Sequence, residues 1–203
     1  MTKVNQELPE LDTLTNRTPV EPGRKRALKW LSEVKLRRWT AACAAVVLLT
    51  FTVHHYGFSL SVVNGTSMAP TLQDGDTLFI NKFYFVVTEP KRGDVITFAD
   101  PHRQGRYLVK RVVGISGDVV EIRGATLYVN GKSVKEAYID VPIEDGNYGP
   151  VAVKEKTVFV MGDNRHKSAS RDSRYDSVGL VPFHLLEGKV EWILWRPSLM
   201  AHL

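Results

Sequence analysis

Residues 107–131 read YLVKRVVGISGDVVEIRGATLYVNG, and this stretch decides the fold class. Two apolar runs rich in Val are separated by the turn pair Gly117-Asp118, and a third run ends at Asn130-Gly131. Asn-Gly is the strongest short-range signal for a hairpin turn. Since β-branched runs between such turns favour strands, we expect a mainly β fold.

The same pattern continues on both sides of this stretch. Beyond residue 60 no long segment has the 3.6-residue apolar period of an amphipathic helix. We expect residues 59–203 to form an antiparallel β domain large enough for a hydrophobic core. Its strands are expected at 77–80, 95–98, 107–114, 119–122, 127–129, 158–161 and 190–195.

The net charge of +5 is unevenly distributed over the 203 residues. Residues 1–38 hold nine Lys and Arg against five Asp and Glu, whereas residues 39–203 are close to neutral. A nucleic-acid-binding domain needs a basic surface to neutralise phosphates, so we expect no nucleic-acid partner. The single cysteine, Cys43, excludes an internal disulfide, a cysteine-cluster zinc site and a CxxC redox pair.

A charge-free segment, WTAACAAVVLLTFTV at residues 39–53, follows the basic cluster. Extended to Phe58 it reaches about 20 residues, the length that a helix needs to span a bilayer. Lys and Arg on its N-terminal flank predict that this end is cytoplasmic. We therefore expect a basic, partly disordered cytoplasmic leader at 1–38, a transmembrane helix at 39–58 and an extracytoplasmic domain at 59–203.

Two alternatives to a membrane anchor remain open. A cleavable signal peptide usually has an apolar core of about 7–15 residues and a small-residue cleavage site, and A-x-A spacing is absent here. A buried core helix would have a polar face, which residues 41–49 lack. In the anchor interpretation, residues 24–38 can form a basic helix on the cytoplasmic membrane face.

Ser67 is the first candidate for chemistry. It lies between Gly65 and Pro70 in the sequence NGTSMAPTL, residues 64–72, where a tight loop can expose a nucleophile. Serine is also common in ordinary surface loops, so this signal is weak when taken alone.

Lys110 is the second candidate. Strand alternation places it on the same face as Leu108 and Val112. Burial on such an apolar face lowers the pKa of a lysine, and a neutral lysine can act as general base for a serine. The alternative is an edge-strand lysine whose ammonium group reaches solvent.

A third cluster follows the expected strand at 158–161. Its sequence, GDNRHKSASRDSR at residues 162–174, is dense in hydrogen-bonding side chains. Such a loop can orient the groups of an active site. It can equally be a surface loop with an Asp172–Arg174 ion pair.

The order of these elements resembles bacterial type I signal peptidases, also called leader peptidases. These are membrane-bound serine endopeptidases that remove signal peptides from exported proteins. The short chain is similar to their compact, Gram-positive-like type. The resemblance rests on an expected anchor followed by S-M-x-P-T-L at 67–72, R-G-D at 92–94, Y-x-V-K-R-V-V-G-x-x-G-D at 107–118 and G-D-N-R at 162–165.

The resemblance implies a role for each matching residue. Ser67 would be the nucleophile and Lys110 its general base. Met68 would support the nucleophile loop and form part of the substrate cleft, while Arg111 and the Asp172–Arg174 pair would brace the loop behind Lys110. Antiparallel sheets with a partly closed barrel are implied, without metal or cofactor. The implied partners are signal-peptide-bearing preproteins and the lipid bilayer, with the enzyme as a monomer, and substrates would carry small residues at the first and third positions before the cut.

Two departures from the family pattern leave roles open. The usual spacing is G-D-N-R-x-x-S-x-D-S-R, and two extra residues lie here between Arg165 and Asp172. Counting forward from Gly162 selects Ser168 as the residue that orients the lysine. Counting backward from Asp172 selects Ser170, which we prefer slightly.

The second departure concerns the oxyanion site. Some family members have, two positions before the nucleophile, a serine whose hydroxyl donates to the oxyanion, but this chain has Gly65. The Ser67 backbone N–H would then be the main donor. The second donor is open, and loss of one donor typically costs about 2.7–4 kcal/mol of barrier.

Three rival functions also remain. A self-cleaving Ser-Lys regulator of the repressor type would normally be soluble, which the expected anchor disfavours. A maturation peptidase dedicated to one substrate, and a non-enzymatic membrane-tethered β module, are the others. The apolar residues Phe79 and 83–87 fit either a core strand or an edge that dips into the membrane.

Overall fold

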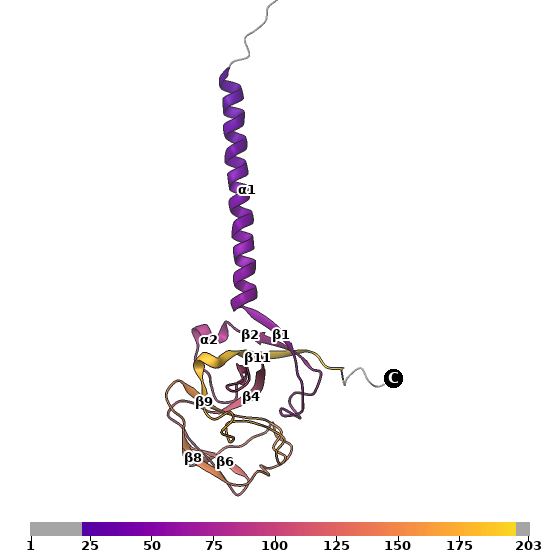
Figure 1. Cartoon of the computed structure of the whole chain (residues 1–203), viewed down its shortest axis with the longest axis vertical. Coiled ribbons are helices and arrows are strands. Elements are labelled where there is room, and N and C mark those ends of the chain that lie inside the picture. The colour runs from indigo at the N-terminus through magenta and orange to yellow at the C-terminus, as the bar shows by residue number, and fades with distance from the viewer. Residues whose placement is uncertain (1–21, 198–203) are drawn as a thin grey trace, which may run out of the picture. The chain divides into compact units, whose positions relative to one another are not determined.

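The computed structural model describes residues 22–197, and it describes only the backbone of residues 22–34 and 53–56. The chain divides into two compact units, Met1–Leu49 and Thr50–Leu203. Helix α1, Pro22–Tyr56, is the secondary structure of the first unit and continues into the second (Figure 1). Of the expected partly disordered leader at 1–38, residues 1–21 lie outside the described residues, and residues 22–38 belong to α1.

The predicted transmembrane segment falls mostly within α1. The helix ends at Tyr56, and strand β1, Phe58–Val62, begins shortly after it. Phe58 therefore belongs to a strand and not to the end of a helix. In the part of the chain that is described, no helix combines the length and apolarity needed to cross a membrane. The anchor at 39–58 stays a prediction.

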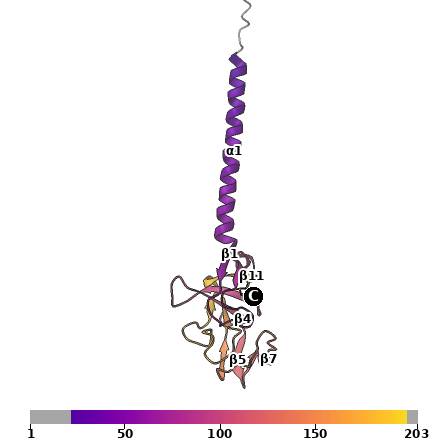
Figure 2. The same ribbon diagram turned by 90° about the vertical axis from the view of Figure 1, so that its right-hand side faces the viewer.

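The second unit contains two sheets, which lie at different ends of it in both views (Figures 1 and 2). The seven-stranded sheet has the order β1, β2 (Thr77–Asn81), β11 (Leu186–Trp195), β3 (Val95–Ala99), β4 (Tyr107–Gly114), β9 (Thr157–Met161) and β10 (Val181–Pro182). The four-stranded sheet has the order β7 (Lys132–Ser133), β6 (Thr126–Val129), β5 (Val119–Arg123) and β8 (Tyr148–Ala152).

The expected mainly β, antiparallel fold is confirmed. Every strand pairing among the described residues is antiparallel. Each expected strand is present, and only β11 differs by more than a residue, because it begins at Leu186. The expected partial barrel stays a prediction, since the hydrogen-bonded order leaves β1 and β10 as edge strands of the larger sheet.

Four strands were not predicted from the sequence. β7 and β10 have two residues each, too few for a recognisable pattern. β8 contains Gly149 and Pro150, which both argue against a strand. β1 directly follows the apolar helix, and its sequence continues the same apolar run.

Residues 83–87 do not form a core strand. Tyr84–Val87 form the short helix α2, in which Val86 and Val87 are 67% and 62% exposed, and the preceding Phe83 is 51% exposed. Phe79 lies in β2, but on the face opposite the buried Leu78 and Ile80, where it is partly buried and stacks with Phe58 and Trp192. The 3₁₀ helix η1, Phe183–Leu185, leads into β11.

Buried apolar side chains fix the position of β4, the strand that carries Lys110. Leu108 and Val112 are buried in one cluster with Ile96 and Phe98 of β3. A second cluster joins β9 to the four-stranded sheet, and a third lies under the loop that contains Ser67. The strand is thus held by packing on both faces.

Candidate active site

Ser67 lies in the loop that joins β1 to β2. The base of this loop is closed by the Val63 N–H, which donates to the Asp76 carbonyl at 2.9 Å. A tight turn around Ser67 follows from the Ala69 N–H, which donates to the Thr66 carbonyl at 3.0 Å. The Ser67 hydroxyl is therefore presented by a constrained turn.

The residues on either side of Ser67 have different functions in the loop. Met68 is 2% exposed and packs with Leu72 and Leu78, so it anchors the loop to the core. Gly65 has a φ of +103°, and its N–H donates to Asp74 Oδ1 at 2.6 Å. Since this φ strains any residue with a side chain, the local backbone accounts for glycine at this position.

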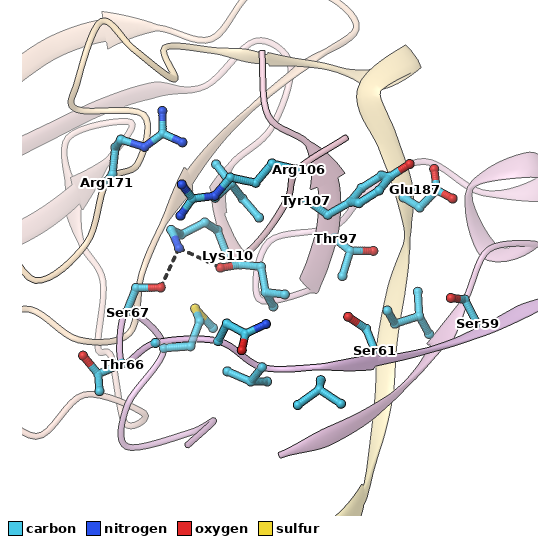
Figure 3. Close-up of a pocket in the computed structure, with 18 of the residues that line it drawn as sticks. Ser59, Ser61, Thr66, Ser67, Thr97, Arg106, Tyr107, Lys110, Arg171 and Glu187 are labelled. Carbon is cyan, nitrogen blue, oxygen red and sulfur yellow. Dashed lines mark hydrogen bonds between the residues drawn. The ribbon is translucent and has the colours of Figure 1, made fainter. Parts of the chain in front are cut away.

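Ser67 and Lys110 meet in a cleft of about 830 Å³ that runs between β1, the Ser67 loop and β4. Lys110 Nζ donates to Ser67 Oγ at 2.7 Å and to the Val109 carbonyl at 2.8 Å (Figure 3). At this distance a neutral amine can instead accept the serine proton. We call this space the active-site cleft.

Burial changes the proton affinity of Lys110. The side chain is on the buried face of β4, as the strand alternation predicts, and the residue is 2% exposed. Its pKa is lowered from 10.5 to about 8, mainly by desolvation and to a smaller extent by the positive charges of Arg171 and Arg106. The carboxylates of Asp172 and Asp163 act in the opposite direction. A large fraction of Lys110 is therefore neutral near pH 8.

Ser170 is the candidate orienting serine that lies close to Ser67. A Cβ atom added to Gly162 would lie 2.3 Å from both Ser170 Oγ and the Ser67 carbonyl oxygen, so the three residues converge at the Gly162 Cα. Ser170 is 1% exposed, and its Oγ has no hydrogen-bond partner among the described residues. An unpaired buried hydroxyl is unusual and calls for an explanation, and Ser170 lies between the cleft-lining Ala169 and Arg171 in sequence.

Ser168 is differently placed. It is exposed, with a φ of +59°, and its backbone N–H donates to Asp145 Oδ1 at 2.8 Å. It lines the cleft, but no hydrogen bond joins it to Lys110 or Ser67 in the described part of the chain. The structure thus brings Ser170 close to Ser67 and leaves Ser168 exposed, and the residue that orients Lys110 stays a prediction.

Arg111 pairs with Asp163 and not with Asp172. Its Nε and Nη2 donate to the two Asp163 oxygens at 2.8 and 2.6 Å, and its Nη1 donates to the Gly93 carbonyl at 2.8 Å. Asp163 is fully buried and also accepts the Thr71 hydroxyl at 2.5 Å. One carboxylate thus ties β4 to the loop of the candidate nucleophile.

The expected Asp172–Arg174 pair is present. Arg174 Nε and Nη2 donate to the two Asp172 oxygens at 2.8 and 2.9 Å, while Arg174 Nη1 donates to Asp145 at 2.8 Å. Asp172 Oδ2 also accepts the Gly162 N–H at 3.2 Å. The pair therefore fixes both ends of the loop that follows β9.

Asn164 was part of a motif, but its function was not predicted. Its backbone N–H donates to the Ser67 carbonyl at 3.2 Å, and its Nδ2 donates to the Thr66 carbonyl at 3.0 Å. These two bonds hold consecutive carbonyls of the Ser67 loop. The position of Asn164 within the G-D-N-R motif was the only signal that could have indicated this.

Residues 134–147, which we call the bracing segment, were missed entirely. Glu136 accepts hydrogen bonds from Arg165 Nη2 at 2.5 Å and Nη1 at 3.0 Å, and Arg165 is fully buried. The Glu136 carboxylate also accepts the Tyr138 hydroxyl at 2.8 Å, and the Tyr138 ring lies 4.0 Å from the Arg111 guanidinium carbon. These pairs join residues far apart in sequence, so no local sequence pattern predicts them.

Two strand edges border the active-site cleft. β1 is an edge strand, and β9 pairs with β4 only from Arg111 onward. Among the described residues, no strand pairs with the edge of β4 at residues 107–110 on the side of the cleft. In the described residues no group of three or more His, Cys, Asp or Glu is arranged to hold a metal ion.

The sequence is similar to that of known proteins over most of its length. Residues 36–195 match the family described as signal peptidase, peptidase S26. The chain is 37% identical to signal peptidase I of Bacillus licheniformis over 169 residues, which cover 79% of this chain and 89% of that protein. It is 36% identical to signal peptidase I T of Bacillus subtilis (strain 168), over 77% of this chain and 84% of that protein.

A solved signal peptidase I from Enterococcus faecalis V583 is 32% identical, with a TM-score of 0.43, over 52% of this chain and 99% of that one. The family match covers most of the sequence, and the relatives are matched over most of their own length. The chain therefore belongs to the peptidase S26 family of signal peptidases.

Proposed function

We propose that this protein is a membrane-bound serine endopeptidase that cleaves N-terminal signal peptides from exported preproteins, with Ser67 as nucleophile and Lys110 as general base. The observation that carries the proposal is the 2.7 Å separation of Ser67 Oγ and Lys110 Nζ inside a cleft. Membership of the signal peptidase family supports the substrate class.

The reaction begins with Lys110 in its neutral form. Its Nζ accepts the proton of the Ser67 hydroxyl while Oγ attacks the carbonyl carbon of the scissile bond. Lys110 then returns the proton to the leaving amine. In the second half it takes a proton from water, which attacks the ester on Ser67 and releases the signal peptide.

The oxyanion of each tetrahedral intermediate needs hydrogen-bond donors. The Ser67 backbone N–H makes no hydrogen bond within the described residues, so it is free to donate. Gly65 has no hydroxyl to donate, and its positive φ disfavours a serine or any other residue with a side chain at this position. Ser170 is the proposed orienting residue for Lys110, because its buried hydroxyl lies near Gly162 and Ser67.

An extended substrate fits between the two strand edges. The edge of β1 and the edge of β4 at residues 107–110 can hydrogen-bond a peptide added as a strand. Met68 lines the same cleft and limits its depth near Ser67. We propose that small substrate residues before the cut are accommodated here.

The proposed topology is a single pass from residue 39 to the end of α1 at Tyr56, with a cytoplasmic N-terminus. Its support is the charge-free stretch at 39–53 behind the basic cluster. The bilayer is a proposed partner of the catalytic unit as well, because large apolar side chains are exposed on β1, α2 and β11. They are Phe58, Leu60, Val62, Phe83, Val86, Val87, Trp192, Ile193, Leu194 and Trp195.

The test is incubation of the purified full chain with a preprotein in non-ionic detergent. Wild type should release the mature protein, identified by its N-terminal sequence, and Ser67→Ala should release none. Cleavage by the Ser67→Ala variant at the wild-type rate, or no cleavage by either protein, would contradict the proposed function. A matched Ser133→Ala control changes an exposed serine of β7 far from the cleft lining.

A further inference from the structure

Asp100, which follows β3, holds two arginine-bearing loops together. Its buried carboxylate pairs with Arg171 and accepts the His102 N–H at 3.1 Å. Its own backbone N–H donates to the Arg106 carbonyl at 2.8 Å. Arg171 Nη1 also donates to the Ser177 carbonyl at 3.3 Å. The loop at 100–106 and the loop that follows β9 are therefore fixed against each other.

Both arginines line the active-site cleft at the end that contains Ser67 and Lys110 (Figure 3). Both side chains lie in the same part of the cleft as Lys110, and their positive charges disfavour the protonated form of Lys110. The charge of Arg171 is balanced by Asp100. The side chain of Arg106 is exposed and makes no ion pair or hydrogen bond with the described residues.

The remaining charges around the cleft are compensated. At its other end Lys82 pairs with Glu187 at 2.5 Å. Behind Lys110, the Asp163 and Asp172 carboxylates are paired with their own arginines. Lys110 itself is neutral when it acts as base. Asp100 also interacts electrostatically with Arg106, so two arginines share one carboxylate, and this end of the cleft has a net positive charge that attracts anions.

From this arrangement we infer that Arg106, supported by Arg171, binds a carboxylate side chain of the substrate close to the scissile bond. The inference rests on the proposed function and concerns which preproteins are cleaved fastest. Guanidinium groups recognise carboxylates through two parallel hydrogen bonds. Because Arg106 lines the part of the cleft that contains Ser67 and Lys110, the acidic residue is expected close to the cut.

The test uses the full chain in non-ionic detergent and internally quenched peptides that keep Ala at the first and third positions before the cut. Asp, Asn or Lys is placed in turn at the second position before the cut and at the first two after it. Each peptide is cleaved by wild type, Arg106→Gln, Arg106→Glu and the control Arg103→Gln. Arg103 is an exposed arginine of the same loop that does not line the cleft.

At one of these positions wild type should cleave the Asp peptide with a kcat/KM about fivefold above that of the Asn peptide, as expected for a partly exposed ion pair. Arg106→Gln should bring the ratio of the two kcat/KM values close to one, and Arg106→Glu should cleave the Lys peptide faster than the Asp peptide. The control Arg103→Gln should keep the wild-type ratio. Raising the salt concentration should reduce the ratio. Equal values for Asp and Asn at all positions, or an Asp preference that survives in Arg106→Glu, overturn the inference. If wild type cleaves none of the peptides, whichever residue they carry, the proposed function fails instead.

Discussion

At the scale of single residues, the environment of Ser170 distinguishes the two candidate orienting serines. Ser170 is buried beside Gly162 and Ser67, whereas Ser168 is exposed and contributes its backbone to Asp145. We expect Ser170→Ala to lower kcat by about tenfold or more, in the range of a lost positioning contact. Ser168→Ala should change kcat less than twofold.

Measured turnover of a single peptide at fixed pH decides between them. If the two variants lose equal, small amounts of activity, neither serine acts on Lys110. The thermal midpoint of each variant should be recorded as well, since removal of the unpaired Ser170 hydroxyl is expected to leave stability nearly unchanged.

The buried Lys110 is predicted to lower the free energy of unfolding at neutral pH. Its folded-state pKa of about 8 lies below the unfolded value of 10.5, so the unfolded chain binds more protons between these values. Stability from this residue is therefore reduced below pH 8 and recovers as the pH rises toward 10.5. Lys110→Met should be inactive and, near pH 7, more stable by on the order of 3 kcal/mol.

Urea unfolding of wild type and Lys110→Met at pH 7 and pH 10 measures this difference. The gap between the two proteins should narrow at the higher pH. A Lys110→Met protein that is less stable than wild type at pH 7 would argue against the desolvation of Lys110 as the cause of its lowered pKa.

At the scale of secondary-structure elements, the contacts of the bracing segment at 134–147 were not predicted from the sequence. Glu136 and the fully buried Arg165 are paired, and the loss of one partner leaves a buried charge unpaired. Glu136→Gln should lower the free energy of unfolding by about 3 kcal/mol and reduce kcat, because the G-D-N-R loop loses its support.

The control for this change is Glu155→Gln, an exposed glutamate in the turn before β9. Chemical denaturation and peptide turnover are measured for both variants. A Glu136→Gln protein with the stability and turnover of the Glu155→Gln control would show that the pair does not support the loop.

The strands themselves were largely predictable, since Val-rich runs between Gly-Asp and Asn-Gly turns give local signals. Lys110 was identified because strand alternation placed it with Leu108 and Val112, and these three residues are buried together. The pairing of Arg111 with Asp163 was not predictable, because it joins residues far apart in sequence. For the same reason the partners of Glu136 and Asn164 were absent from the sequence-based account.

At the scale of the whole molecule, the topology gives a further prediction. With Cys43 replaced by Ser, a cysteine introduced at Ser133 should react with a membrane-impermeant maleimide added to intact cells. A cysteine introduced at Ser32, in the basic leader, should react only after lysis. Reaction of the Ser32→Cys probe in intact cells, or protection of the Ser133→Cys probe there, would contradict the proposed orientation.

The central claim is that neutral Lys110 activates Ser67, and the pH dependence of kcat/KM tests it most directly. Below the Lys110 pKa of about 8 the rate should rise about tenfold per pH unit, and above it the rate should level off. Lys110→Met should show no cleavage at any pH. A wild-type rate that is constant from pH 6 to 9, or an active and folded Lys110→Met enzyme, would contradict the account.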